Sequence, residues 1–200
     1  MRKTPASPET QNTFAAPHPL AERLIERLAG FPAARVLEFA AGRGRNTRAF
    51  RSAGLNVIAI DDAAAASAQP LREITGLFAA AISTHGLLHG RADDVRANVR
   101  AIADLLQAGG LLYATFVSTR DARFGTGERI DAFTFAPLDG DERGVAHAYF
   151  DRPNLAALLA QPFDIESLEE RDVDAIAGVW AHSQRPLAGA VHWFAIARKR

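Results

Sequence analysis

The sequence predicts an α/β fold built on a doubly wound, mostly parallel sheet, and three observations support this. Residues 34–50, ARVLEFAAGRGRNTRAF, read as a strand, a glycine turn and the start of a helix. Further strand-length apolar runs then alternate with helical patterns. Asp61 and Asp62 directly follow the second apolar run. Because ligands of such sheets bind at the carboxyl ends of the strands, these residues indicate a binding site there.

The first strand and its turn carry the clearest signal for a ligand. Val36, Leu37 and Phe39 form a short apolar run in which Glu38 is embedded. Gly42 and Gly44 allow a ligand to approach backbone that any side chain would block. The free N–H groups at the start of the following helix favour a partly negative ligand.

Composition limits the kind of protein. The chain has 200 residues, 23 basic and 23 acidic side chains and no cysteine. The length fits one domain with a lid, and the balanced charge favours neither nucleic acid nor an anionic membrane as a partner. Disulfides and thiolate metal sites are excluded. Because neither a membrane-spanning run nor a signal-peptide core is visible, we expect a cytoplasmic protein.

The turn motif resembles that of a known family. Glu38-x-Ala40-x-Gly42-x-Gly44 is similar to the first motif of class I S-adenosylmethionine-dependent methyltransferases, an acidic residue followed by G-x-G-x-G, with Ala40 replacing the first glycine. GRGRNT looks most like small-molecule methyltransferases related to tellurite-resistance enzymes. The block LLQAGGLLYATF, residues 105–116, resembles the family's helix stop before a strand. A dinucleotide fingerprint would instead require glycine where Thr47 stands.

This resemblance implies a Rossmann-like fold, S-adenosyl-L-methionine as cofactor and a set of cofactor-binding residues. In the family the first carboxylate faces the cofactor's amino group, and an acid after the second strand binds the ribose hydroxyls. Those roles fall on Glu38 and on Asp61, with Asp62 as the second choice for the ribose; Asp62 could cap a helix at the same time. The expected cofactor-binding set is Glu38, Ala40, Gly42, Gly44, Asn46, Asp61, Asp62, Ser83 and His85.

The segment after Asp62 is too short for the family's usual third strand. Only about sixteen residues separate Asp62 from the strand expected at 78–83, enough for one helix and a right-handed crossover. We therefore expect six strands in the family order 2-1-4-5-7-6, with the last strand antiparallel. The strand at 56–60, read as buried, then lies at the edge. That edge should be covered by residues 63–69 or by a second protomer in a homodimer.

The remaining elements follow from periodicity and turn residues. We expect a tail over residues 1–17 and a single domain over 18–200. Helices are predicted at 19–29, 93–106, 151–160 and 172–183, and strands at 36–39, 56–60, 77–83, 111–116, 163–168 and 192–197. The closing strand resembles the family's antiparallel last strand.

His85 and His89, spaced i, i+4 after the strand at 77–83, raise the question of a metal. No cysteine or nearby carboxylate completes a ligand set, so we expect no metal site. We expect His85 to face cofactor or substrate, although it could simply cap local backbone.

Residues 118–150 combine many charges with four glycines and show no helical pattern, as expected for a functional loop region. Their position after the fifth strand resembles the family's substrate lid, although a solvated flap would give the same pattern. The candidates for the substrate pocket are Arg123, Thr134, Glu142, His147 and Tyr149.

These features predict a methyltransferase acting on a small-molecule acceptor. Methyl transfer needs alignment more than acid–base groups, so no catalytic residue can be assigned. One alternative is a methyltransferase-derived binding or interaction module with weak or lost cofactor binding, because the adenine side looks truncated. A nicotinamide oxidoreductase is disfavoured by Thr47 and by the closing strand.

Overall fold

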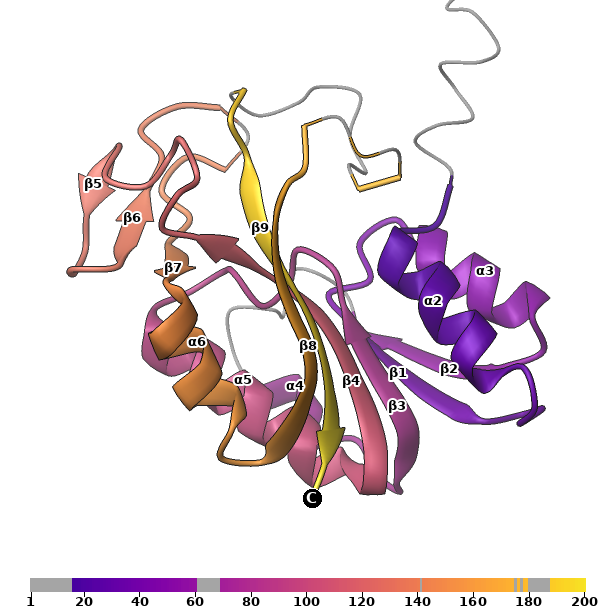
Figure 1. Ribbon diagram of the computed structural model, residues 1–200. Helices are drawn as coiled ribbons and strands as arrows, with labels where there is room; N and C mark the ends of the chain where they lie inside the picture. The colour runs from indigo at the N-terminus through magenta and orange to yellow at the C-terminus, as the bar shows by residue number, and fades with distance from the viewer. Residues whose placement is uncertain (1–15, 61–68, 141, 175, 177, 180–187) are drawn as a thin grey trace, which may run out of the picture.

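The protein is a mixed α/β structure in a computed structural model that describes residues 16–60, 69–140, 142–174, 176, 178–179 and 188–200 (Figure 1). The central strands lie in the order β2-β1-β3-β4-β9-β8. They are β1 (Arg35–Phe39), β2 (Asn56–Ile60), β3 (Phe78–Ser83), β4 (Leu106–Ser118), β8 (Phe163–Asp172) and β9 (Val191–Lys199). The first four are mutually parallel, and β9 runs antiparallel to both β4 and β8. The predicted strand order and the antiparallel last strand are confirmed.

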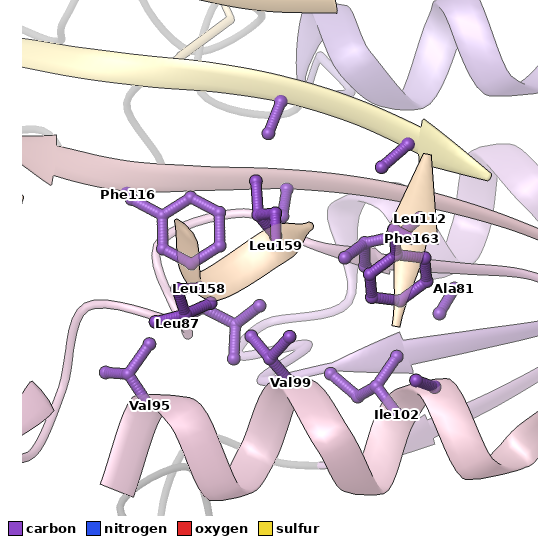
Figure 2. Packing of buried hydrophobic residues seen from close by; sticks show 14 of the residues in the cluster. Ala81, Leu87, Val95, Val99, Ile102, Leu112, Phe116, Leu158, Leu159 and Phe163 are labelled. Atoms are coloured by element: carbon purple, nitrogen blue, oxygen red, sulfur yellow. The ribbon is translucent and has the colours of Figure 1, made fainter. Parts of the chain in front are cut away.

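Helices cover both faces of this sheet (Figure 1). The first face is covered by α2 (Pro19–Leu28) and α3 (Arg45–Ser52), and the second by α4 (Gln69–Arg72), α5 (Ala92–Leu105) and α6 (Arg152–Leu159). Figure 2 shows Val95, Val99 and Ile102 of α5 pointing toward the sheet, as their helical spacing predicts. Two fully buried layers therefore hold the strands in place.

The helices begin at capping residues that the sequence supplies. Asp151 accepts a hydrogen bond from the Asn154 N–H at 2.9 Å, and α6 has proline in its first turn. At α2, His18 Nδ1 accepts from the Leu20 N–H at 3.1 Å. Histidine is not among the preferred N-cap residues, so the sequence alone does not identify His18 as the cap of α2.

Strand β4 is longer than predicted because the glycine pair lies inside it. It begins at Leu106 directly after α5, and Gly109 adopts a φ of 72°. Between the pairs Phe78–Leu106 and Ala80–Leu111 the register shifts. The glycines thus form an irregularity within the strand rather than a loop before it.

The carboxyl-terminal hairpin also differs from the prediction. Strands β8 and β9 pair with each other from Phe163–Lys199 to Asp172–Val191. Backbone hydrogen bonding therefore makes both strands longer than the apolar runs from which they were predicted. The helix predicted over 172–183 is wrong for its described residues, which are not helical after β8 ends at Asp172. Gly178 has a φ of 77°, which helical geometry does not allow.

Strand β2 lies at the edge, as predicted, but it is not buried. Asn56 and Ala59 are exposed, the other three residues are half-buried, and among the described residues β2 pairs only with β1. The described part of the following connection, residues 69–77, contains α4 and no strand. Residues 61–68, which include most of the segment expected to cover β2, lie outside the described chain.

The predicted lid contains a small antiparallel sheet. It comprises β5 (Glu128–Arg129), β6 (Thr134–Ala136) and β7 (His147–Phe150), and β7 also pairs with the last two residues of β4 (Figure 1). The lid therefore adjoins the carboxyl end of β4. Within the described ranges, no helix is long and apolar enough to cross a membrane.

Candidate functional site

The turn between β1 and α3 lies at the carboxyl end of the sheet and has unusual backbone geometry. Ala40, Gly42 and Gly44 have φ values of 62°, 51° and 70°. Ala40 thus adopts the left-handed conformation at the position where the motif it resembles carries glycine. The Ala41 N–H donates to the Ile60 carbonyl at 2.7 Å, which ties the turn to the end of β2.

Glu38 lies beneath this turn and is only 2% exposed. The Thr47 hydroxyl, from the first turn of α3, donates a hydrogen bond to Glu38 Oε2. Burial raises the pKa of Glu38, and the hydrogen bonds from Thr47 and Asn46 oppose that rise. Because burial disfavours the charged carboxylate, a cationic group of a ligand placed beside it would gain a strong partner.

Asn46 connects three parts of the site. Its Nδ2 donates to Thr84 Oγ1 at 3.1 Å, and its Oδ1 accepts from the His18 N–H at 2.8 Å. These bonds link α3 to the loop after β3 and to the start of α2. Asn46 therefore positions the neighbouring elements as well as contacting Glu38.

The loop after β3 packs tightly against the β1 turn. A Cβ atom at Gly86 would lie 2.3 Å from Ala40 Cβ and 2.7 Å from Ser83 Oγ. Ser83 is fully buried, and its hydroxyl has no hydrogen-bond partner among the described residues. Ala40 and Ser83, predicted as cofactor-binding residues, are thus brought together by the absence of a side chain at Gly86.

Three histidine rings meet at the same end of the sheet. The His85 ring centroid lies 5.9 Å from that of His18 and 5.2 Å from that of His192. His85 has a φ of 68°, and its N–H donates to Thr115 Oγ1 at 2.9 Å. Burial lowers the pKa of His18 well below its usual value and that of His192 to about 4. The rings of His18 and His192 are therefore neutral at physiological pH.

Arg45 holds two distant segments against this region. Its guanidinium donates to the carbonyls of Gly178 and, at 2.6 Å, Val179. It also reaches the Ala16 carbonyl at 3.5 Å, at the end of the predicted tail. These contacts place the chain between β8 and β9 against α3. Asp61 and Asp62, predicted to bind the ribose, lie outside the described residues.

The lid candidates fall into two groups. Arg123 forms a bidentate pair with Asp121, whose Oδ2 also accepts from the Val191 N–H at 3.0 Å. Tyr149 packs against Phe124 and Phe135, and burial raises its pKa to about 12. Thr134 is fully buried, and its hydroxyl has no partner in the part of the chain that the structure describes.

Glu142 and His147 form the second group and contact His89. His147 Nε2 and His89 Nε2 lie 3.2 and 3.6 Å from the two oxygens of Glu142. His85 and His89, considered together from their spacing, thus belong to different clusters. Glu142, the acidic partner of His89, lies 53 positions further along the chain, so no local spacing pattern connects the two residues.

An open groove of about 330 Å³ lies between α5 and α6, apart from the turn site. Among the predicted site residues it includes only Tyr149. Glu38, Asn46 and the histidine cluster do not line it, so it is a separate surface.

Four residues that contribute to these sites were not predicted: His18, Thr47, His89 and His192. Thr47 could have been found from its place one helical turn from the glycine pair. His18 and His192 lie in unrelated parts of the sequence, and no spacing rule connects them to His85.

The sequence matches no protein-family model, and no curated protein matches it in sequence. Solved structures do match over most of the chain. The Burkholderia thailandensis 1,6-didemethyltoxoflavin-N1-methyltransferase, solved with 1,6-didemethyltoxoflavin and S-adenosylhomocysteine, is 22% identical, with 100% of this chain and 93% of that chain covered and a TM-score of 0.61.

Two further solved structures agree. The magnesium protoporphyrin IX methyltransferase of Synechocystis with bound S-adenosylmethionine is 12% identical, covers 99% of this chain and 87% of its own, and gives a TM-score of 0.57. The CcbJ methyltransferase of Streptomyces caelestis is 14% identical, with 93% and 92% covered and a TM-score of 0.57. At these identities the similarity establishes the fold, which is the Rossmann-like fold of class I methyltransferases.

Proposed function

We propose that this protein is an S-adenosylmethionine-dependent methyltransferase acting on a small-molecule acceptor. The observation that carries the proposal is the buried carboxylate of Glu38 beneath a left-handed turn at the carboxyl end of β1. A buried carboxylate can accept about four hydrogen bonds, and its described side-chain partners are Thr47 and Asn46. The site therefore fits a ligand that brings an ammonium group to Glu38.

The residues around the turn would hold the cofactor. Glu38 would accept hydrogen bonds from the amino group, and the backbone of residues 40–44 would lie along the methionine part. We propose Asp61, with Asp62 as the second choice, for the ribose hydroxyls, since β2 ends beside the turn at Ile60. Ser83 and His85 complete the proposed set at the end of β3.

When bound, the cofactor supplies an electrophilic methyl group, so the protein needs to orient the acceptor and exclude water. Arg45 contributes to closure by holding Gly178 and Val179 over α3. We propose that the lid over residues 118–150 shapes the acceptor pocket through Arg123, Thr134, Glu142, His147 and Tyr149. The solved methyltransferases of similar fold that act on small molecules support an acceptor of this class.

The second candidate function is a binding or interaction module with weak or lost cofactor binding. Residues 69–77 supply no third strand, and in the family the residue after that strand contacts adenine. We therefore expect weak cofactor affinity, with a dissociation constant of tens of micromolar or more, equivalent to about 6 kcal/mol or less.

Calorimetric titration of site variants with S-adenosylhomocysteine tests these assignments. Glu38→Ala and Asp61→Ala should each weaken binding by about 1–3 kcal/mol, because each removes an acceptor. The matched control is Asp104→Ala, an exposed acid on α5. If both site variants bind as tightly as the control, the assigned roles are wrong.

A further inference from the structure

Two imidazoles and one carboxylate converge at the junction of the lid and the loop after β3. One ligand atom each from His89, Glu142 and His147 lies within 4.8 Å of the others. We propose that these three side chains form a binding site for a divalent transition-metal ion, with zinc as the ion that best suits them. The site rests on its own geometry and does not depend on the proposed methyl transfer.

The backbone fixes the two histidines side by side. His89 and His147 form an isolated antiparallel bridge, flanked by hydrogen bonds from Gly90 N to the Ala146 carbonyl and from Ala148 N to the Leu88 carbonyl, each 2.8 Å. Because these hydrogen bonds join the neighbouring residues, His89 and His147 themselves are a non-hydrogen-bonded pair of the antiparallel ladder. Side chains approach each other most closely in pairs of this kind. The ring centroids are 5.1 Å apart.

Glu142 reaches the histidines from a tight turn before β7. The Val145 N–H donates to the Glu142 carbonyl at 2.9 Å, and the Gly144 N–H donates to the Pro137 carbonyl at 2.9 Å. Gly144 has a φ of 76°, which suits glycine in such a turn. The lid thus supplies two ligands from one short segment, and the loop after β3 supplies the third.

The orientation of His147 is that of a metal ligand. Its Nδ1 lies 2.8 Å from the Val145 carbonyl, which can only accept a hydrogen bond, so Nδ1 carries the proton. In the neutral ring, Nε2, which faces Glu142, then carries the lone pair that can bind a metal ion. A backbone carbonyl that orients the far nitrogen of the ring is the usual support of a metal-bound histidine.

The distances from each histidine to Glu142 are close to those between ligands of one small ion. Two ligands at about 2.1 Å from a tetrahedral zinc ion are about 3.4 Å apart. Glu142 oxygens lie 3.2 Å from His147 Nε2 and 3.6 Å from His89 Nε2. Without an ion, these contacts become ion pairs only when the imidazole rings are protonated, so Zn²⁺ and protons should compete for the site.

The chemistry of the three ligands determines which ion they bind best. Two imidazoles and a carboxylate suit zinc and its neighbours, whereas magnesium and calcium prefer oxygen ligands alone. The Glu142 side chain is 45% exposed, and those of His89 and His147 are 18% and 3% exposed. The ion would therefore keep an open position on the Glu142 side for water or for a donor atom of a ligand.

Metal titration of the untagged full-length protein, freed of metal by chelation, tests the proposal. Calorimetry with Zn²⁺ should show one ion per chain, Co²⁺ should give visible ligand-field bands, and Mg²⁺ should not bind. Glu142→Gln and His89→Gln should each weaken Zn²⁺ binding about tenfold or more, as losing a ligand should cost at least as much as losing its support. Glu128→Gln, an exposed acid on β5, is the matched control.

Several results would overturn the proposal. These are absence of Zn²⁺ and Co²⁺ binding to the parent protein, unchanged binding in Glu142→Gln, or loss of binding in His85→Gln while Glu142→Gln still binds. The last result would assign the ion to the other histidine cluster. Because Glu142 is half exposed, its variant should fold even if a His147 variant does not, and a thermal melt checks this.

Discussion

The hydroxyl of Thr47 donates a hydrogen bond to the buried carboxylate of Glu38, across the turn that joins β1 to α3. Position 47 is where a dinucleotide fingerprint would require glycine, and here its side chain has a structural role. The pair fixes the carboxylate at the open end of the sheet and opposes the effect of burial on its pKa. The turn thereby departs from the dinucleotide fingerprint at this position.

Removing the Thr47 hydroxyl should destabilise the folded protein. Thr47→Val preserves the shape of the side chain but removes one of the two described side-chain donors to a buried carboxylate, so the free energy of unfolding should fall by about 1–3 kcal/mol. Thr47→Ser, which keeps the hydroxyl, is the control. Urea unfolding measures both, and equal stability of the two variants would contradict the role assigned to this hydrogen bond.

Gly86→Ala should destabilise the protein and weaken cofactor binding. The new Cβ atom would overlap Ala40 Cβ, and overpacking of this kind costs about 1–3 kcal/mol. Gly30→Ala is the control, because a Cβ there meets nothing within 4 Å. The double variant Ala40→Gly/Gly86→Ala should recover part of the lost stability. Thermal melts of the four proteins test this, and no difference between the two single variants would refute the close approach.

Stability should fall as pH decreases below about 6.5. Because burial lowers the folded-state pKa values of His18 and His192, the unfolded chain binds more protons in this range. With a folded pKa of about 4 and an ordinary value of 6.5, His192 should contribute about 2 kcal/mol of lost stability at pH 5. Glu38, whose pKa is raised, acts in the opposite sense at lower pH.

The difference between the parent and His192→Gln isolates this contribution. Urea unfolding at pH 7.5 and pH 5 should show a smaller loss of stability in the variant than in the parent. An identical pH dependence in both proteins would mean that His192 is not held neutral by the fold.

The exposed edge strand predicts self-association. Of the two expected ways of covering this edge, residues 63–69 or a second protomer, the second predicts a homodimer in which β2 meets β2 of another copy, because the outer backbone groups of β2 have no partner strand among the described residues. Ala59→Lys places a charge on this edge and should shift the protein to monomer in sedimentation experiments. Ala53→Lys, exposed but outside β2, is the control. A monomeric parent protein would rule out this pairing.

The strand order was predictable because each connection allowed few topologies. Alternating strands and helices required parallel neighbours, and the short chain after Asp62 excluded a second crossover. What the sequence could not show was where pairing extends beyond the apolar residues. Gly109 reads as a stop, yet within a sheet it is accommodated as an irregularity in β4.

The candidate site was predictable only where its residues are close in sequence. Glu38 and the glycine turn lie within seven positions, so their relationship is visible as a motif. His18, His85 and His192 meet only after the sheet has formed, as do His89 and Glu142. Long-range convergence of this kind leaves no periodic signal in the sequence. The expectation of no metal site therefore did not take into account that Glu142 and His147 lie beside His89.

The most direct test of the proposed function is calorimetric titration of the parent protein with S-adenosylmethionine, S-adenosylhomocysteine and NAD. The buried acceptor at Glu38 and the turn above it predict binding of the first two ligands, with dissociation constants of tens of micromolar or more. NAD should not bind. Binding of NAD instead would contradict the assignment of the turn, and binding of none of the three would favour the module that has lost its cofactor.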